Sequence, residues 1–159
     1  MKRIFPVLLA LLWTVGMAGC GEQPEETAVQ PPPVYVPSAY LTTEQVEEAV
    51  GFAVREPEIL TNGEVGYFSE DDSAVAYVSM QQLPLAEFDA MIANATAAGS
   101  VLEEAPHLGE KAFWCEEQLD LLAYAYGFAL DVRVEYRADR PNDSLLAARH
   151  LAALIMEKL

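Results

Sequence analysis

Positively charged residues are scarce in this sequence. Its 159 residues include 9 Lys and Arg against 25 Asp and Glu, so the formal net charge at pH 7 is −16. A surface this acidic repels nucleic-acid phosphates and anionic lipid headgroups, which argues against nucleic acid as a partner. The charge fits either a surface for cationic ligands or metal ions or, more simply, a well-solvated acidic surface.

Cysteine and histidine are almost absent as well. The cysteines are Cys20 and Cys115, and Cys115 has no partner in the chain if Cys20 is modified, so we expect no internal disulfide. Cys115 follows Trp114 in a predicted strand, where a buried apolar thiol is expected. The two histidines, His107 and His150, lack the neighbouring Cys and His residues of a zinc site.

Motifs of common catalytic sites are missing too. The chain contains no Gly-x-Ser-x-Gly elbow, no phosphate-binding glycine loop and no helix with paired metal ligands. The acidic run Glu70-Asp71-Asp72 lacks the spacing of a calcium loop, and we predict a polar turn there. We therefore predict no catalytic residue, no metal site and no cofactor.

The beginning of the chain has the order of a secretion signal. Lys2 and Arg3 precede an uncharged, mostly apolar run from Ile4 to Met17. As a helix this run is roughly 21 Å long, short of the ~30 Å hydrocarbon core of a bilayer. A permanent transmembrane anchor is therefore not expected from this segment.

The apolar run ends in Met17-Ala18-Gly19-Cys20, which resembles the lipobox of bacterial lipoproteins. The resemblance implies cleavage before Cys20 and a diacylglycerol thioether on its thiol. Cleavage removes two basic residues and no acidic ones, which leaves 7 Lys and Arg against 25 Asp and Glu and a net charge of about −18. We predict an exported protein that Cys20 anchors to a bacterial membrane, facing outside the cytoplasm. Gly21, by resemblance to known sorting behaviour, favours the outer membrane if the cell is diderm.

The next segment is rich in proline and acidic residues. Proline lacks a backbone N–H and fixes its φ angle, so this composition is typical of an extended tether rather than a helix or strand. The prolines are Pro24, Pro31, Pro32, Pro33 and Pro37. We therefore divide the chain into a signal peptide (1–19), a lipidated cysteine with its tether (20–40) and a single domain (41–159).

Three stretches of the domain have the patterns of helices. Thr42 can cap the first helix, and Gly51 is placed to end it. The second lies between Pro84 and Gly99, where apolar residues recur at helical spacing. Asn142 or Asp143 is predicted to cap the third. The buried stripe of this last helix is predicted to consist of Ala148, Leu151, Ile155 and Leu159.

Six further stretches have the patterns of strands. Asn62-Gly63 is a strong hairpin signal between the first two, and residues 128–136 alternate regularly between apolar and polar. The predicted strands are 54–60, 64–68, 74–82, 111–115, 121–126 and 128–136. The sequence therefore predicts an α+β domain, an antiparallel sheet of about six strands with three helices, in the order α-β-β-β-α-β-β-β-α.

Three motifs of the domain resemble those of a known family. They are Leu41-Thr42-Thr43-Glu44-Gln45-Val46 with Gly51, Leu108-Gly109-Glu110-Lys111-Ala112-Phe113, and Ala147-Ala148-Arg149-His150-Leu151-Ala152. The family comprises small, mostly uncharacterised bacterial lipoproteins, relatives of the extracellular sensor domain of a mycobacterial-type receptor kinase. The resemblance covers about residues 41–159. It implies a ligand-binding cleft and contributes no catalytic residues.

Aromatic residues are the candidates for lining such a cleft, because they combine broad apolar contact with a polar tip. They are Tyr67, Tyr77, Trp114 and Tyr124, with Tyr126 close by; the alternative is that they fill the core. We predict a non-catalytic domain that binds a small ligand or an envelope protein. Two alternatives are an extracytoplasmic hydrolase or thiol redox enzyme that uses Cys115 or His107, and a structural subunit of an envelope assembly.

Overall fold

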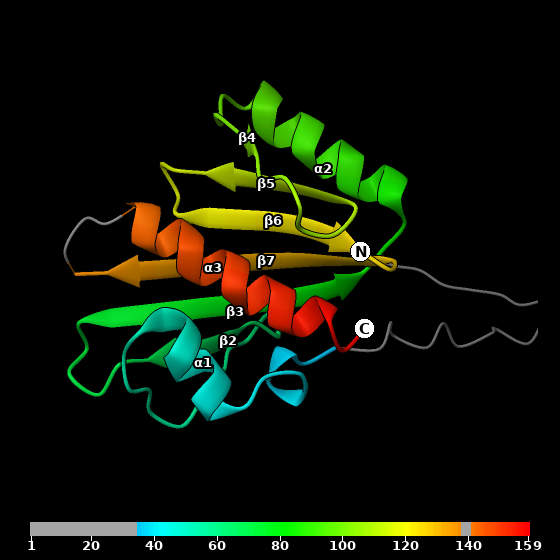
Figure 1. The fold of residues 1–159 in the computed structure, drawn as a ribbon. Helices are drawn as coiled ribbons and strands as arrows, with labels where there is room; N and C mark the ends of the chain where they lie inside the picture. Colours follow the sequence, from blue (N-terminus) through cyan, green and yellow to red (C-terminus); the bar gives the residue numbers. More distant parts are fainter. Residues whose placement is uncertain (1–34, 138–140) are drawn as a thin grey trace, which may run out of the picture. The chain divides into compact units, whose positions relative to one another are not determined.

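The structure, a computed structural model, describes residues 35–137 and 141–159 (Figure 1). Seven strands form one antiparallel sheet in the order β1-β2-β3-β7-β6-β5-β4, accompanied by three α-helices. The predicted α+β class is confirmed. The prediction of about six strands is wrong, as is the predicted order, because the second half of the chain contributes four strands: α-β-β-β-α-β-β-β-β-α.

The first helix, α1 (Thr43–Val50), begins and ends where the sequence predicts. Thr42 Oγ1 accepts a hydrogen bond from the Gln45 N–H at 3.3 Å, and Gln45 Oε1 accepts one from the Thr42 N–H at 3.1 Å. These two bonds form a capping box. Gly51 follows with φ 75°, the left-handed conformation that commonly ends helices and that glycine adopts without strain.

The first three strands are β1 (Glu58–Ile59), β2 (Val65–Phe68) and β3 (Ala74–Gln82), which pair as an antiparallel meander. The strand predicted over residues 54–60 is confirmed only at Glu58–Ile59, and its predicted length is wrong. Instead, an isolated bridge joins Val54 to Ser69, and β1 has only two residues. Pro57 lies between the bridge and β1, and it has no backbone N–H to donate to a continuous ladder.

The centre of the sheet is the pair formed by β3 and β7 (Phe128–Tyr136). All nine residues of each strand pair, from Ala74↔Tyr136 to Gln82↔Phe128. Buried residues alternate with half-buried ones over residues 74–80 and 130–135, and this pattern explains why the sequence predicts both strands correctly.

The remaining strands are β4 (Glu103–Glu104), β5 (Lys111–Cys115) and β6 (Asp120–Ala125). β4 is the strand that the sequence does not predict; it pairs with Phe113 and Trp114 at the sheet edge. β6 begins and ends one residue before its predicted bounds. This shift places Tyr126 in the β6–β7 turn, beside Gly127, rather than in a strand.

The helices cover the two faces of the sheet unequally. α1 and α3 (Pro141–Met156) lie against each other on one face (Figure 1), where their apolar residues join the main core. α2 (Leu85–Ala97) packs on the opposite face, through Phe88 against Phe113 and Tyr124. Neither Asn142 nor Asp143 is the N-cap of α3 as predicted, because the helix already begins at Pro141.

Residues 35–40, which the sequence assigns to the tether, pack on the domain. The ring of Tyr35 packs edge-on against the ring of Phe128, with the ring centres 4.9 Å apart. Its hydroxyl donates a hydrogen bond to Gln82 Oε1 at 2.8 Å. Pro37 begins a 3₁₀ turn (Pro37–Ala39) and is buried. The domain therefore includes these residues. The predicted signal peptide (1–19) and Cys20 lie outside the described part of the chain. No helix in the described part is both long and apolar enough to cross a bilayer.

Candidate functional site

The aromatic residues predicted to line a cleft are separated by the sheet. Tyr67 and Trp114 are buried in the main core, under α1 and α3. Tyr124 lies on the other face in the small cluster under α2, where its hydroxyl donates to Leu83 O at 3.2 Å. Tyr77 lies on that second face beyond the α2 cluster. The four residues therefore do not line one cleft.

Tyr67 is the most deeply buried of them, at 1 % exposure. Burial raises the pKa of its phenol to about 12. Its hydroxyl has no hydrogen-bond partner among the described residues. These features are those of a core tyrosine with an unsatisfied hydroxyl, and no ligand can reach it without opening the core.

A row of polar side chains crosses the second face of the sheet beside α2. Tyr77, Arg133, Asp120 and Cys115 are directly opposite one another in β3, β7, β6 and β5, so their side chains lie on the same face. The Arg133 guanidinium lies 4.6 Å from the centre of the Tyr77 ring. Arg133 Nε also lies 3.0 Å from Glu135 Oε1, an ion pair without the orientation of a hydrogen bond.

Asp120 is the most perturbed acid in this row. Burial raises the pKa of its carboxyl to about 8; a hydrogen bond with Asp131 and the negative charges of Asp131 and Glu64 add to the rise, and Arg133 opposes it. Oδ1 of Asp120 is buried without a hydrogen-bond partner in the described part of the chain. Asp120 therefore keeps its proton at neutral pH, beside the Asp131 carboxylate.

Cys115 and the histidines, the reactive groups that the enzyme alternative would use, are not brought together. Cys115 is 1 % exposed, so a substrate could not reach its thiol in the folded domain. His107 and His150 are both exposed, in the β4–β5 loop and in α3. Among residues 35–137 and 141–159, no cluster of three or more His, Cys, Asp and Glu side chains could hold a metal ion.

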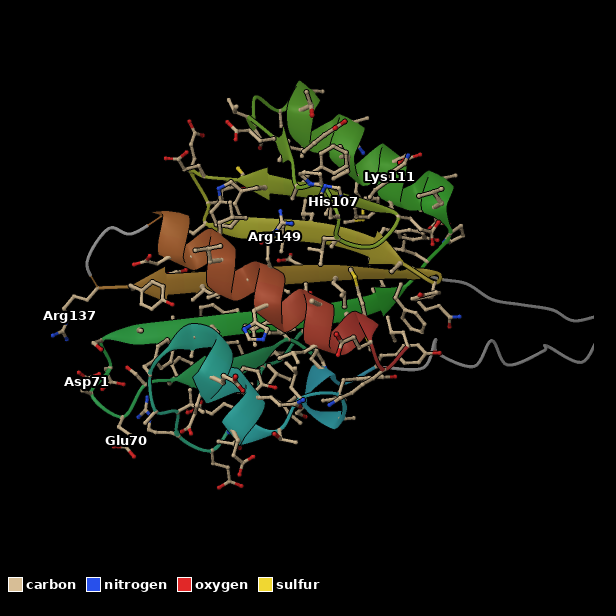
Figure 2. All side chains as sticks on the ribbon, in the orientation of Figure 1. Glu70, Asp71, His107, Lys111, Arg137 and Arg149 are labelled. Atoms are coloured by element: carbon tan, nitrogen blue, oxygen red, sulfur yellow. The ribbon has the colours of Figure 1, made fainter. Side chains whose placement is uncertain are left out.

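The Glu70-Asp71-Asp72 run forms the β2–β3 turn, at the end of the sheet where Figure 2 labels Glu70, Asp71 and Arg137. Asp71 Oδ1 accepts hydrogen bonds from Ser69 Oγ and the Ser73 N–H, both at 3.0 Å. Bonds from Ser73, through side chain and backbone, and from Ser69 lower the pKa of Asp71 to about 2. Asp71 therefore closes the polar turn that the sequence predicts.

A hollow lies on the face that carries α1 and α3. Its volume is about 480 Å³, and three separate segments line it: the β4–β5 loop, the β6–β7 turn and the last turn of α3. The lining residues are His107, Leu108, Gly109, Glu110, Ala125, Tyr126, Ala153, Met156 and Glu157. We call this hollow the loop pocket. A smaller one, of about 310 Å³, lies along the same loop.

Short contacts fix the loop that forms the pocket. Arg149, on α3, donates to Pro106 O at 2.6 Å, and Figure 2 shows Arg149 and His107 close together. The Glu110 N–H donates to Tyr124 O at 2.8 Å, and Glu110 Oε1 accepts from the Tyr126 N–H at 3.1 Å. The loop is therefore held by α3 on one side and by the β6–β7 turn on the other.

Gly109 is required where the loop crosses the end of β6. Its φ is 62°, and a Cβ atom added there would lie 2.5 Å from Tyr124 O, closer than a real Cβ contact. The left-handed conformation and the close backbone approach both exclude a side chain at this position. The Leu108-Gly109-Glu110 sequence is thus explained by the shape of the loop.

Two other residues of the loop pocket have left-handed backbones without being glycine. His107 has φ 64° and Tyr126 has φ 53°. Such conformations are uncommon for side chains of this size and cost of order 1–3 kcal/mol each. Asp72 and Leu119 share this conformation, in other turns. Strained residues often lie at functional sites, and His107 and Tyr126 therefore favour a functional role for this pocket.

Sequence reasoning did not find the loop pocket. Its three segments are far apart in the sequence, and Tyr126 was assigned to a strand. Two signals were nevertheless present: a glycine follows Tyr126, as in a tight hairpin, and Gly109 lies in one of the motifs noted above. The chain matches no protein-family model and is similar to no curated protein or solved structure, so its relation to the sensor-domain lipoproteins stays a prediction.

Proposed function

We propose that the protein is an exported, lipid-anchored binding domain without catalytic activity, and that the loop pocket is its ligand site. The lipobox-like sequence before Cys20 supports the anchor and the extracytoplasmic location. The pocket supports the binding role. Its volume of about 480 Å³ falls within the roughly 300–1,000 Å³ of small-molecule sites, and its lining combines an apolar floor with a few polar groups.

The observation that carries this proposal is the construction of the pocket. Gly109, strained His107 and strained Tyr126 all serve to bring three distant segments around one hollow. Because Asp72 and Leu119 have the same conformation in ordinary turns, the convergence of the three segments supports the proposal more than the strain does. The proposal also favours a small ligand over a large envelope partner, because the groups converge on a hollow rather than on a flat surface.

The test is native mass spectrometry of the full-length protein, gently extracted from its own envelope. We expect a defined mass above that of the bare lipidated chain, and the difference identifies the ligand. A bare chain, in repeated extractions, would contradict the proposal and favour a structural role.

A blocking variant locates the site. Ala153 lines the pocket from α3 and is half-buried, so Ala153→Trp should fill the hollow without disturbing the buried stripe of the helix. The matched control is Ala90→Trp, on an exposed position of α2. We expect the extra mass to disappear in Ala153→Trp and to remain in the control; an extra mass in both variants would place the ligand elsewhere.

A further inference from the structure

We infer that the ligand of the loop pocket is a small organic cation with an apolar body, such as a quaternary or primary amine. This inference rests on the proposed binding function and adds the chemical class of the ligand. It follows from four features of the pocket: its acidic side chains, its place at the end of α3, its exposed aromatic ring and its apolar floor.

Two carboxylates line the pocket, from opposite sides. Glu110 comes from the β4–β5 loop, and Glu157 follows the last residue of α3. The only hydrogen bond of the Glu110 carboxylate within the described residues uses Oε1, which leaves Oε2 for a ligand. Both side chains belong to exposed residues, and neither has an ion-pair partner in the described part of the chain.

The C-terminal end of α3 adds to the negative potential of the two carboxylates. Aligned peptide dipoles place about half a negative charge at the C-terminus of a helix, where a basic residue is usually favoured. The last turn of α3 contains no basic residue, and Glu157 follows it directly. Lys158 extends to α1 instead, where its Nζ donates to Tyr40 O and, at 2.9 Å, to Gln45 Oε1. The Glu157 carboxylate therefore lies at a helix end that itself favours a positive charge.

Tyr126 supplies an aromatic surface next to the carboxylates. It is 71 % exposed although it is large and apolar, and its backbone is in the left-handed region. Asparagine or glycine would fit this turn position with less strain. A cation is attracted to the face of an aromatic ring, which gives the tyrosine a role that asparagine lacks.

The other residues of the lining fit the body of an amine and not a bare metal ion. Leu108, Ala125, Ala153 and Met156 form the apolar part of the lining. Arg149, which is bonded to Pro106 O of the same loop, is not among the lining residues. His107 is the one lining side chain that can become positively charged. The lining of the pocket therefore combines acidic side chains with apolar ones.

The probe is choline, compared with its neutral carbon isostere 3,3-dimethylbutan-1-ol, which has the same shape. Each is titrated into the full-length protein in maltoside micelles, and binding is followed by the amide NMR shifts of Gly109, Gly127 and Glu157. We expect saturable shifts with choline and binding at least about tenfold weaker for the isostere, because only choline carries the charge.

Variants separate charge from shape. Glu110→Gln keeps an Oε1 atom for the Tyr126 N–H and removes only the charge, and Glu157→Gln does the same at the end of α3. We expect each to weaken choline binding about three- to tenfold. Glu48→Gln makes the same charge change on an exposed site of α1 and should leave binding unchanged.

A third variant tests the aromatic ring without endangering the fold. Tyr126→Asn should weaken choline binding while leaving the protein at least as stable, since asparagine tolerates the left-handed turn. Equal binding of the neutral isostere, no binding of choline, or full binding by both glutamine variants would each overturn the inference. The proposed function is tested separately, by the native mass spectrum and by the Ala153→Trp variant, so the two failures are distinguishable.

Discussion

At the scale of single residues, left-handed backbone conformations mark the places where this chain gives up stability for shape. Glycine supplies some of them, and His107 and Tyr126 supply two more at the loop pocket. At Gly109 this conformation comes with a close approach to Tyr124 O, whereas a Cβ atom added at Gly51 would have no atom within 4 Å. The two glycines therefore separate the effect of conformation from that of contact.

Gly109→Ala should destabilise the domain by about 2–4 kcal/mol, because the new methyl group meets a backbone oxygen in a strained conformation. Gly51→Ala should lower the stability of the domain by only about 1 kcal/mol, because only the left-handed conformation opposes the new side chain. Urea unfolding followed by circular dichroism measures both. Equal losses in the two variants would show that the contact with Tyr124 O is unimportant.

Asp120 gives the stability of the domain a dependence on pH. Its pKa rises from 3.8 to about 8 on folding, so the folded state keeps a proton that the unfolded state releases above about pH 4. The stabilisation is complete below pH 4 and is lost as the pH rises towards 8. The free energy of unfolding should therefore fall across this range through Asp120.

Asp120→Asn removes that dependence. The amide can still donate to Asp131, and it cannot ionise. We therefore expect the free energy of unfolding of the variant to exceed that of the parent by about 1–3 kcal/mol at pH 9 and by much less at pH 5. Thermal unfolding at a series of pH values measures the difference. Glu48→Gln serves as the control with the same charge change; a difference that does not vary with pH would contradict the assignment.

At the scale of elements, the sequence predicts most of what local pattern determines. The capping box fixes α1, and regular alternation fixes β3 and β7. β4 was missed because two charged residues on an edge strand carry no apolar pattern. The hairpin signal at Asn62-Gly63 correctly predicts that β1 pairs with β2, but the pairing of β3 with β7 could not be predicted, since it joins distant parts of the chain.

The same limit applies to the candidate site. The aromatic side chains were chosen by type, and the sheet places Tyr67 and Trp114 on one face but Tyr77 and Tyr124 on the other. Which face of a strand packs under α1 and α3 depends on strand pairing and on where the helices lie, and residue type alone reveals neither. The loop pocket depends on contacts between three separate segments, which no local pattern specifies.

The attachment of α2 is the element-level feature most open to test. Phe88 is its only fully buried residue, and it packs on Phe113 and Tyr124. Phe88→Ala should destabilise α2 by about 3 kcal/mol, so that its amides exchange hydrogen faster while those of β3 and β7 remain protected. Hydrogen-exchange mass spectrometry measures this. Met91→Ala, at an exposed position, should leave exchange unchanged, and loss of protection throughout the sheet would contradict independent opening of α2.

At the scale of the whole molecule, the proposal combines an anchor with an acidic domain. After cleavage before Cys20 the chain would carry a charge of about −18, which keeps it apart from anionic lipid headgroups. Membrane association must then come from lipid on the cysteine rather than from the protein surface.

Cys20→Ala tests that dependence. We expect the variant to move from the detergent phase to the aqueous phase in a Triton X-114 partition, while the parent stays with the detergent. Cys115→Ala is the matched control, because Cys115 is buried and should not affect partition. Retention of the Cys20 variant in the detergent phase would contradict lipid attachment at this residue.

The full pairing of β3 with β7 has a consequence for folding. It joins residue 74 to residue 136 and residue 82 to residue 128, so the centre of the sheet forms only after a long loop has closed. Until β7 is available, β3 is an edge with nine residues and unpaired backbone groups, a surface prone to pair with other chains. Neither half of the domain can serve as a separate folding unit, and the chain must be complete through β7 before its fold is secure.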